Sequence, residues 1–168
     1  MAKHSKAHHD STGTPALRAV IAAGVPHTLH EHAVDMSTDG ELGAEAARLL
    51  GVAPDRVLKT LIADASGRLV VGVVPVSGHL DLKALARAVG AKKAQMADPA
   101  VAERSSGYVV GGISPLGQRT RLPTVIDSSV LEHETIYVSA GKRSLKLEMA
   151  PADLVRLAGA TVARIRTD

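Results

Sequence analysis

The chain has 168 residues, of which 45% are apolar and 22% are charged, and its net charge is +3. This length suits one domain with a single core, and the composition excludes a wholly disordered or fibrous protein. The longest apolar run, from Leu69 to Val76, is much shorter than the ~20 residues of a membrane span. Because the polar N-terminal segment also lacks the apolar stretch of a secretory signal, we expect a cytoplasmic protein without a membrane partner.

The first 13 residues are polar and show no periodicity, so we expect a disordered tail there. Its histidines are more typical of adventitious metal binding than of a metal site. Thr14 and Pro15 are typical of a helix N-terminus, as the cap and the first helical residue, and Gly24 is typical of a helix end. The pattern then predicts a strand at His27–Glu31 and a helix from about Asp39 to Leu50.

Two apolar segments around Ser66-Gly67, Val57–Ala63 and Leu69–Val76, indicate a β-hairpin. Further helices are expected at Leu82–Val89, from Pro99 to about Ser105 and at Pro151–Leu157. Further strands are expected at Ala94–Met96, Tyr108–Val110, Pro123–Ile126, Thr135–Ser139, Leu145–Glu148 and Thr161–Ile165. Because strands and helices mix irregularly, without strict βαβ alternation, the sequence predicts an α+β fold in one domain, residues 14–168.

Charge is distributed unevenly along the chain. Residues 83–146 contain ten Lys or Arg and five Asp or Glu, whereas residues 1–82 contain seven and nine. This excess predicts a positive face that suits an anionic partner, although ordinary solvated surface cations are an equal alternative. The chain has no Phe or Trp and only two Tyr, which disfavours the base-stacking modules that bind single-stranded nucleic acid.

The sequence contains no standard catalytic motif. There is no cysteine, which excludes disulfides, thiolate metal sites and a thiol nucleophile supplied by the protein. The motifs G-x-S-x-G, H-E-x-x-H, G-x-G-x-x-G and the P-loop are all missing. His30 and His32 share a strand face, but two histidines without a third ligand are more typical of a surface.

Two segments nevertheless suggest a site. Lys59 lies inside an apolar strand, where alternation places it on one face with Val57 and Leu61. Such a lysine either extends to solvent from an edge strand or points into a cleft and binds a phosphate or a carbonyl oxygen. The loop Gly111–Gly117 contains three glycines, whose amides could approach a ligand closely and form an oxyanion hole, although many such loops are only turns.

These segments resemble the YbaK/EbsC family. The resemblance rests on VLKTL, on the GYVVGGISPLGQ…RLPT block and on IYVSAGKRSLKLEM, and it extends from about Thr14 to the C-terminus. It implies a YbaK-like fold, with a mixed curved sheet flanked by helices. More narrowly, the chain resembles the YbaK-type proteins that deacylate Cys-tRNA(Pro) in trans, after prolyl-tRNA synthetase has charged that tRNA with cysteine.

The resemblance also implies a mechanism in which the thiol of the substrate attacks its own ester and leaves as a thiolactone. No cofactor or metal is then required, the partners are Cys-tRNA(Pro) and prolyl-tRNA synthetase, and DNA is not a partner. A chain without its own nucleophile is compatible with this, because positioning and charge stabilisation would be its main tasks. The alternatives are a deacylase for another small amino acid, such as alanine on tRNA(Pro), or a binding module with little turnover.

Matching motifs assign expected roles to residues of this chain. Lys59, Gly111 and Gly112 are the expected catalytic residues. The expected substrate-binding residues are Thr60, Ile113, Ser114, Pro115, Ser139, Lys142, Arg143 and His32. The chain departs from the family twice: His32 lies near the position of an aromatic residue at the end of the first strand, and Lys146 occupies the position of a pocket-side aspartate. Both departures concern the wall on the substrate side and therefore the preference for cysteine.

Overall fold

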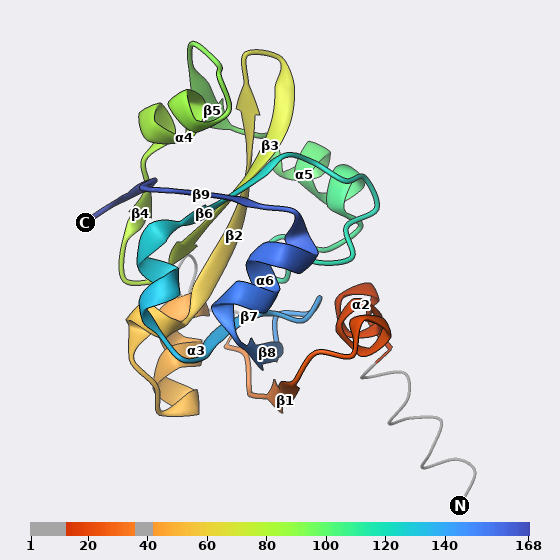
Figure 1. The fold of residues 1–168 in the computed structure, drawn as a ribbon. Helices are drawn as coiled ribbons and strands as arrows, with labels where there is room; N and C mark the ends of the chain where they lie inside the picture. The colour runs from red at the N-terminus through yellow and green to blue at the C-terminus, as the bar shows by residue number, and fades with distance from the viewer. Residues whose placement is uncertain (1–12, 36–41) are drawn as a thin grey trace, which may run out of the picture.

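The computed structural model describes residues 13–35 and 42–168. The expected tail, except for Gly13, and the start of the helix expected from Asp39 lie outside these ranges. Within them, no helix is long and apolar enough to cross a membrane. The fold is α+β, as the sequence predicts, with helices packed around sheets (Figure 1).

A five-stranded mixed sheet forms the centre of the molecule, in the order β5-β2-β3-β6-β9. The long hairpin of β2 and β3, in the middle of Figure 1, is antiparallel and turns at Ser66-Gly67 as expected. β5 pairs antiparallel with β2, whereas β6 and β9 add parallel strands beyond β3. The bounds are Leu58–Ala65 for β2, Arg68–Pro75 for β3, Ala94–Met96 for β5, Thr124–Asp127 for β6 and Thr161–Ala163 for β9.

A second, antiparallel sheet has the order β1-β8-β7. Its strands are β1 (His27–Glu31), β7 (Ile136–Ser139) and β8 (Leu145–Met149). A single parallel bridge between Val57 and Tyr137 joins it to the start of β2. A third pair, β4 (His79–Leu80) with β10 (Arg166–Thr167), fastens the C-terminal segment beside α4.

The helices begin and end largely where their sequence signals indicate. They are α2 (Pro15–Ala23), α3 (Leu42–Leu50), α4 (Leu82–Ala88), α5 (Pro99–Ser106) and α6 (Pro151–Ala158), with short 3₁₀ turns η1 (Pro54–Arg56) and η2 (Ser128–Glu132). Thr14 Oγ1 accepts a hydrogen bond from Leu17 N, and Gly24 ends α2 with a positive φ of 68°. Both confirm the expected capping chemistry.

Alternation along β2 and β3 divides the apolar residues between two cores. Leu58, Ile62 and Val71 face the main core, which the second sheet, α2 and α6 complete. Ala63 and Val70 face a smaller core that α4 covers with Leu85. Because both faces of the hairpin are buried, its two strands consist of nearly continuous runs of apolar residues in the sequence.

Two expected strands differ in the structure. Residues 108–110 form a turn, because Tyr108 is buried and its hydroxyl donates to the carbonyl of Leu116, 2.7 Å away. The strand expected at Thr161–Ile165 ends at Ala163, because the amide of Ile165 donates to Asp127 Oδ1 at 2.9 Å and leaves the strand ladder. In both cases a tertiary hydrogen bond overrides the local β-propensity.

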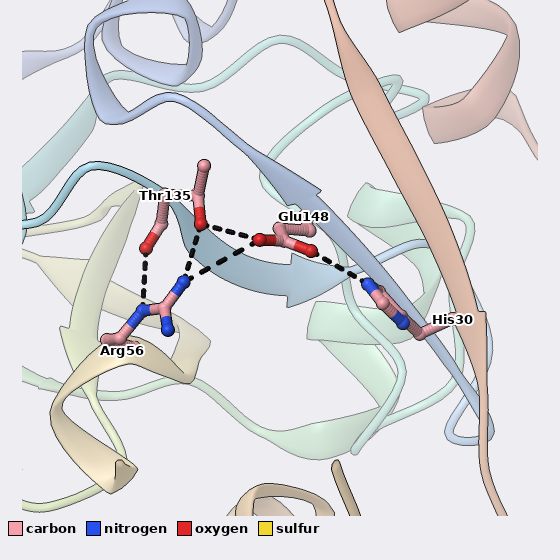
Figure 2. Close-up of polar contacts among 4 residues, drawn as sticks. All are labelled: His30, Arg56, Thr135 and Glu148. Atoms are coloured by element: carbon pink, nitrogen blue, oxygen red, sulfur yellow. Dashed lines mark hydrogen bonds and ion pairs between the residues drawn. The ribbon is translucent and has the colours of Figure 1, made fainter. Parts of the chain in front are cut away.

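A polar network ties η1 to the second sheet (Figure 2). Glu148 on β8 accepts from Thr135 Oγ1 at 2.6 Å and contacts His30 Nε2 at 2.9 Å. Arg56 donates to the carbonyl of Thr135 at 3.0 Å, and its guanidinium lies 5.2 Å from the ring centroid of Tyr137. The Thr135 hydrogen bond, followed by the His30 contact, holds the pKa of Glu148 below its usual value.

The first prediction concerns this network. The ionised Glu148 stabilises the fold above its unfolded pKa of ~4.3, and this contribution is lost as the pH falls through the lower folded pKa. Glu148→Gln should therefore lower the free energy of unfolding by about 1–2 kcal/mol at pH 7. Urea unfolding should show the difference between variant and wild type shrinking towards pH 3.

Asp153→Asn is the matched control, because among the described residues Asp153 forms an ion pair only with the exposed Arg156 one helical turn away on α6. The Asp153→Asn substitution should change the free energy of unfolding by no more than about 0.5 kcal/mol. Equal effects of the two variants, or a Glu148→Gln effect independent of pH, would contradict the prediction.

Candidate active site

One edge of β2 has no neighbouring strand at residues 58–62 within the described part of the chain. On that side β2 pairs with β5 only at Ala63–Ala65 among the described residues, and a single β-bridge between Val57 and Tyr137 joins the chain just before β2 to β7. A cavity of about 620 Å³ opens between these two contacts. Besides β2, it is lined by the segment around Gly111, by β7 and β8, and by apolar residues of α3 and α5. Its volume suits a small ligand or the end of a larger one.

The peptide groups of Thr60 point towards this cavity. Val57 and Val76 form a hydrogen-bonded pair, with Val76 N 2.8 Å from Val57 O. Because bonded and non-bonded pairs alternate in an antiparallel ladder, Lys59 bonds to β3 and Thr60 directs its N–H and C=O away from β3. The Thr60 hydroxyl is buried and has no partner among the described residues. Thr60 thus supplies polar backbone groups to the cavity wall.

Lys59 is half-buried and lines the same cavity. The described residues give its ammonium no acidic partner, and burial lowers the pKa of Lys59. Side chains alternate between the two faces of β2, as the sequence predicts. The cavity lies along the edge of this strand, so residues from both faces line it. Lys59 is therefore a cation available to a ligand at this edge.

The two adjacent glycines of the loop occupy different places. Gly111 lines the cavity, has a φ of +89°, and would place a Cβ 3.0 Å from Leu42 Cδ1 and from Arg143 Nε. Gly112 is buried, and its amide donates to Val109 O at 2.8 Å. The expected oxyanion hole therefore cannot use the Gly112 amide as it stands; the Gly111 amide is the candidate that remains.

Ser139 holds the glycine loop to the turn that follows β7. Its Oγ donates to the carbonyl of Gly112 at 2.7 Å and accepts from the amide of Gly141 at 3.1 Å. Arg143 adds a second link, because its Nε donates to Val110 O at 2.9 Å. Both side chains also line the cavity, so they fix its shape as well as facing it.

The other expected site residues divide into two groups. Ile113 lines the cavity. Ser114 is fully buried and accepts from the amide of Leu116, Pro115 lines a separate cavity of about 270 Å³, and Lys142 is exposed. The structure thus does not bring Ser114, Pro115 and Lys142 to the main cavity. Neighbouring residues of the same motifs, Gly111, Ile113 and Arg143, line it instead.

Lys146, which the family motif places on the substrate side, lies in the cavity wall. It is only 6% exposed, lines the cavity, and burial lowers its pKa to about 8. His32 is outside the lining, but its Nε2 lies 3.3 Å from Lys146 Nζ. Alternation in Leu145-Lys146-Leu147 is the sequence signal, because two core leucines on one face place the lysine between them on the other.

The charged residues of the described lining are all cationic: Lys59, Arg143 and Lys146. The remaining walls are mostly apolar, with Leu42 from α3, Val76 after β3 and Ala102 from α5. These apolar residues come from separate elements, so no local pattern in the sequence could have grouped them. Such a cavity suits a ligand that combines an anionic group with a small apolar part. Within 13–35 and 42–168, no cluster of three or more His, Asp or Glu could hold a metal ion.

Comparison with known proteins gives one matching family and close relatives. The sequence model of the aminoacyl-tRNA editing domain matches residues 40–157. EbsC of Enterococcus faecalis, provisionally named a Cys-tRNA(Pro)/Cys-tRNA(Cys) deacylase, is 37% identical over 92% of this chain and 93% of its own. The proline–tRNA ligase of Moorella thermoacetica is 34% identical over 44% of this chain, a match that covers 13% of the ligase.

A solved structure has the same fold. It is provisionally described as a trans-editing enzyme for prolyl-tRNA synthetase, and it superposes with a TM-score of 0.80 over 92% of this chain and 96% of its own. Its sequence identity is 24%, so this likeness shows the fold alone.

The second prediction concerns the link that Ser139 makes. Ser139→Ala should reduce the free energy of unfolding by about 1–3 kcal/mol, because it leaves the Gly112 carbonyl and the Gly141 amide without their partner. Ser105→Ala is the control: the Ser105 hydroxyl is buried without a partner among the described residues, so removing it should cost nothing. Equal losses in thermal or urea unfolding would show that the Ser139 bonds are not important.

Proposed function

The chain belongs to the family of aminoacyl-tRNA editing domains, and on this premise we propose that it is a deacylase that removes cysteine from mischarged Cys-tRNA(Pro) in trans. Residues 14–168 would form the catalytic domain, working in the cytoplasm without the tail. The similarity to EbsC supports the substrate, and the partial similarity to a proline–tRNA ligase supports action on the same tRNA.

The observation that carries the proposal is the cavity at the free edge of β2. Its volume of about 620 Å³ suits the aminoacylated terminal adenosine, and Lys59 and Arg143 in its lining suit the adjoining phosphate and the ester oxygen. Within the described lining, the Ser139 hydroxyl is already donated to the Gly112 carbonyl, so it is not poised as a nucleophile. A substrate that brings its own nucleophile fits such a site.

In the proposed mechanism the substrate thiol attacks the ester carbonyl, and the tRNA leaves as cysteine closes into a thiolactone. Lys59 binds the terminal phosphate or orients the carbonyl, and the Gly111 amide stabilises the oxyanion. The outward-facing peptide groups of Thr60 fix the aminoacyl group against the edge of β2. The apolar wall excludes water, which strengthens each of these electrostatic interactions.

Contacts with the body of the tRNA would come from the basic segment 83–146. Its lysines and arginines would bind phosphates, which gives affinity without strong sequence selectivity. Selection of tRNA(Pro) would then come from acting beside prolyl-tRNA synthetase, where the mischarged product is released.

The third prediction tests the substrate. The protein is incubated with Cys-, Ser-, Ala- and Pro-tRNA(Pro), and the remaining ester and any thiolactone are measured. Cys-tRNA(Pro) should be cleaved quickly and Ser-tRNA(Pro) far more slowly, because a hydroxyl is much less ionised than a thiol near neutral pH. Ala- and Pro-tRNA(Pro) should be spared.

Each other result identifies another function. Equal rates for the cysteine and serine esters would indicate a bound water as nucleophile. Preferred cleavage of Ala-tRNA(Pro) would indicate an alanine deacylase. Retarded migration of the tRNA with an intact ester would indicate a binding module.

The fourth prediction concerns Lys59. Lys59→Ala should lower turnover of Cys-tRNA(Pro) by roughly 10²–10³-fold, as expected for the loss of one contact that stabilises charge in the transition state. Lys59→Arg should not restore it fully, because a planar guanidinium cannot replace a compact ammonium. Circular dichroism on the same samples should show an unchanged fold.

Arg164→Ala is the control, because Arg164 is an exposed cation that lies outside the segment 83–146 and does not line the cavity. Its turnover should equal that of the wild type. Near-normal activity of Lys59→Ala would mean that Lys59 merely extends to solvent from the edge of β2.

A further inference from the structure

Lys146 is a buried cation that the proposed roles of Lys59 and Gly111 leave without a task. It is 6% exposed, and it faces the cavity while Leu145 and Leu147 on either side pack in the main core. A buried ammonium without a carboxylate partner is costly to the fold. Such a cost is typical of a functional group.

The hydrogen bonds of Lys146 define how its amine is held. Nζ lies 3.3 Å from the carbonyl of Arg143 and 3.3 Å from His32 Nε2. His32 Nδ1 is 2.8 Å from the carbonyl of Ala33, which can only accept, so Nδ1 carries the ring proton and Nε2 is an acceptor. Burial lowers the pKa of His32, which favours this neutral ring.

Two of the three ammonium hydrogens are therefore bound to protein. The described residues provide no partner for the third, and Lys146 lines the cavity. The remaining hydrogen, or the lone pair once that proton is lost, is thus directed to the ligand.

Burial favours the loss of that proton, and the charged and titratable groups around Lys146 come from several elements. Across the strands it faces His30 on β1, whose ring is bound to Glu148, and Ser139 on β7. Lys59 of β2 and Arg143 line the same cavity, while Glu45 of α3 acts on His32. The two cations and the two carboxylates among these groups balance in number, and burial lowers the pKa of Lys146 to about 8.

We propose that Lys146 is the catalytic base of the deacylation, taking the proton from the substrate thiol; this rests on the proposed function. The thiol proton moves to Nζ, and the thiolate forms the bond to the ester carbonyl carbon. The bond from that carbon to the ribose oxygen then breaks, and the ribose oxygen takes the proton back from Nζ. The products are uncharged tRNA and cysteine thiolactone, and Lys146 is again neutral.

The acidity of the two groups matches this role. A free thiol has a pKa of ~8.5 and Lys146 one of about 8, so transfer between them is nearly balanced in free energy. The ammonium that results also stabilises the thiolate beside it. Arginine at this position could offer the charge but could not accept the proton.

The test uses a bound thiol that cannot react further. The probe is 3′-cysteinylamido-3′-deoxyadenosine, in which an amide replaces the ester, and it is titrated by the ultraviolet absorbance of its thiolate. Because the protein has no cysteine, the thiol of the probe is the only one in the sample. On wild-type protein the thiol should ionise at a lower pH than it does free in solution. On Lys146→Met, an apolar variant of similar length, this shift should be absent.

Turnover of Cys-tRNA(Pro) gives the second readout. Lys146→Met should be about 10²-fold slower at pH 7, in the range of general base catalysis. The deficit should narrow between pH 7 and pH 9, because the thiol then ionises without help. A constant deficit across this range would show that Lys146 only shapes the cavity and would overturn the proposal.

Chemical rescue provides the third readout. The cysteine of Lys146→Cys would be the only one in the chain, so 2-bromoethylamine converts it selectively into an aminoethyl side chain of nearly lysine length. Because its sulfur lowers the amine pKa, activity should return with its pH dependence shifted to lower pH. Rescue without that shift would contradict a role as base.

The outcomes for the two proposals are distinct. If the probe binds and its thiol ionises at a lower pH on wild-type protein than on Lys146→Met, the role of Lys146 as a base is supported even where turnover is slow. If the probe binds and Lys146→Met changes neither titration nor turnover, the role of Lys146 fails while the editing function stands. If wild-type protein neither binds the probe nor cleaves Cys-tRNA(Pro), both proposals fall.

Discussion

The site depends on an incomplete strand pairing. β2 is bonded to β3 along its whole length, but on its other side it meets β7 at Val57 and β5 only from Ala63 onward. The short strand β5 ends at Met96, and its chain turns into α5 rather than continuing along β2. This leaves a gap in which peptide groups, a lysine and apolar side chains can meet one ligand. A longer β5 would fill the gap and remove the cavity.

Hydrogen bonds and an ion pair between the surrounding elements fix the geometry of this gap. The Ser139 bonds and the Arg143 bond tie the glycine segment to the turn before β8, and the Glu148 network ties β8 to η1 at the start of β2. The glycine segment and the start of β2, which border the cavity, are thus each tied to the second sheet. Rigid walls allow a few charges to act at fixed positions, which is what charge stabilisation in a transition state requires.

Much of the fold could be predicted from the sequence because its signals are local. The Thr14-Pro15 start of α2, the Ser66-Gly67 hairpin and the glycine ends of helices each depend on neighbouring residues. The strand expected at residues 108–110 is wrong because Tyr108 is fixed by a distant carbonyl. Lys59 and Gly111 could be assigned from the family motifs. The motifs also place Lys146 on the substrate side, but they do not predict its burial or its contact with His32. The apolar wall could not be assigned, because its residues come from separate elements that pack around the cavity.

The position of β1 has a consequence for where such a domain can be cut. The family match covers residues 40–157, whereas β1 lies before it and pairs with β8 from Glu31↔Leu145 to His27↔Met149. Without β1, the strand that carries Lys146 and Glu148 would become a sheet edge with unpaired amides and carbonyls. A protein that carries only the core segment must therefore supply an equivalent strand from elsewhere. Grafting this unit into another enzyme would require the graft to begin before His27.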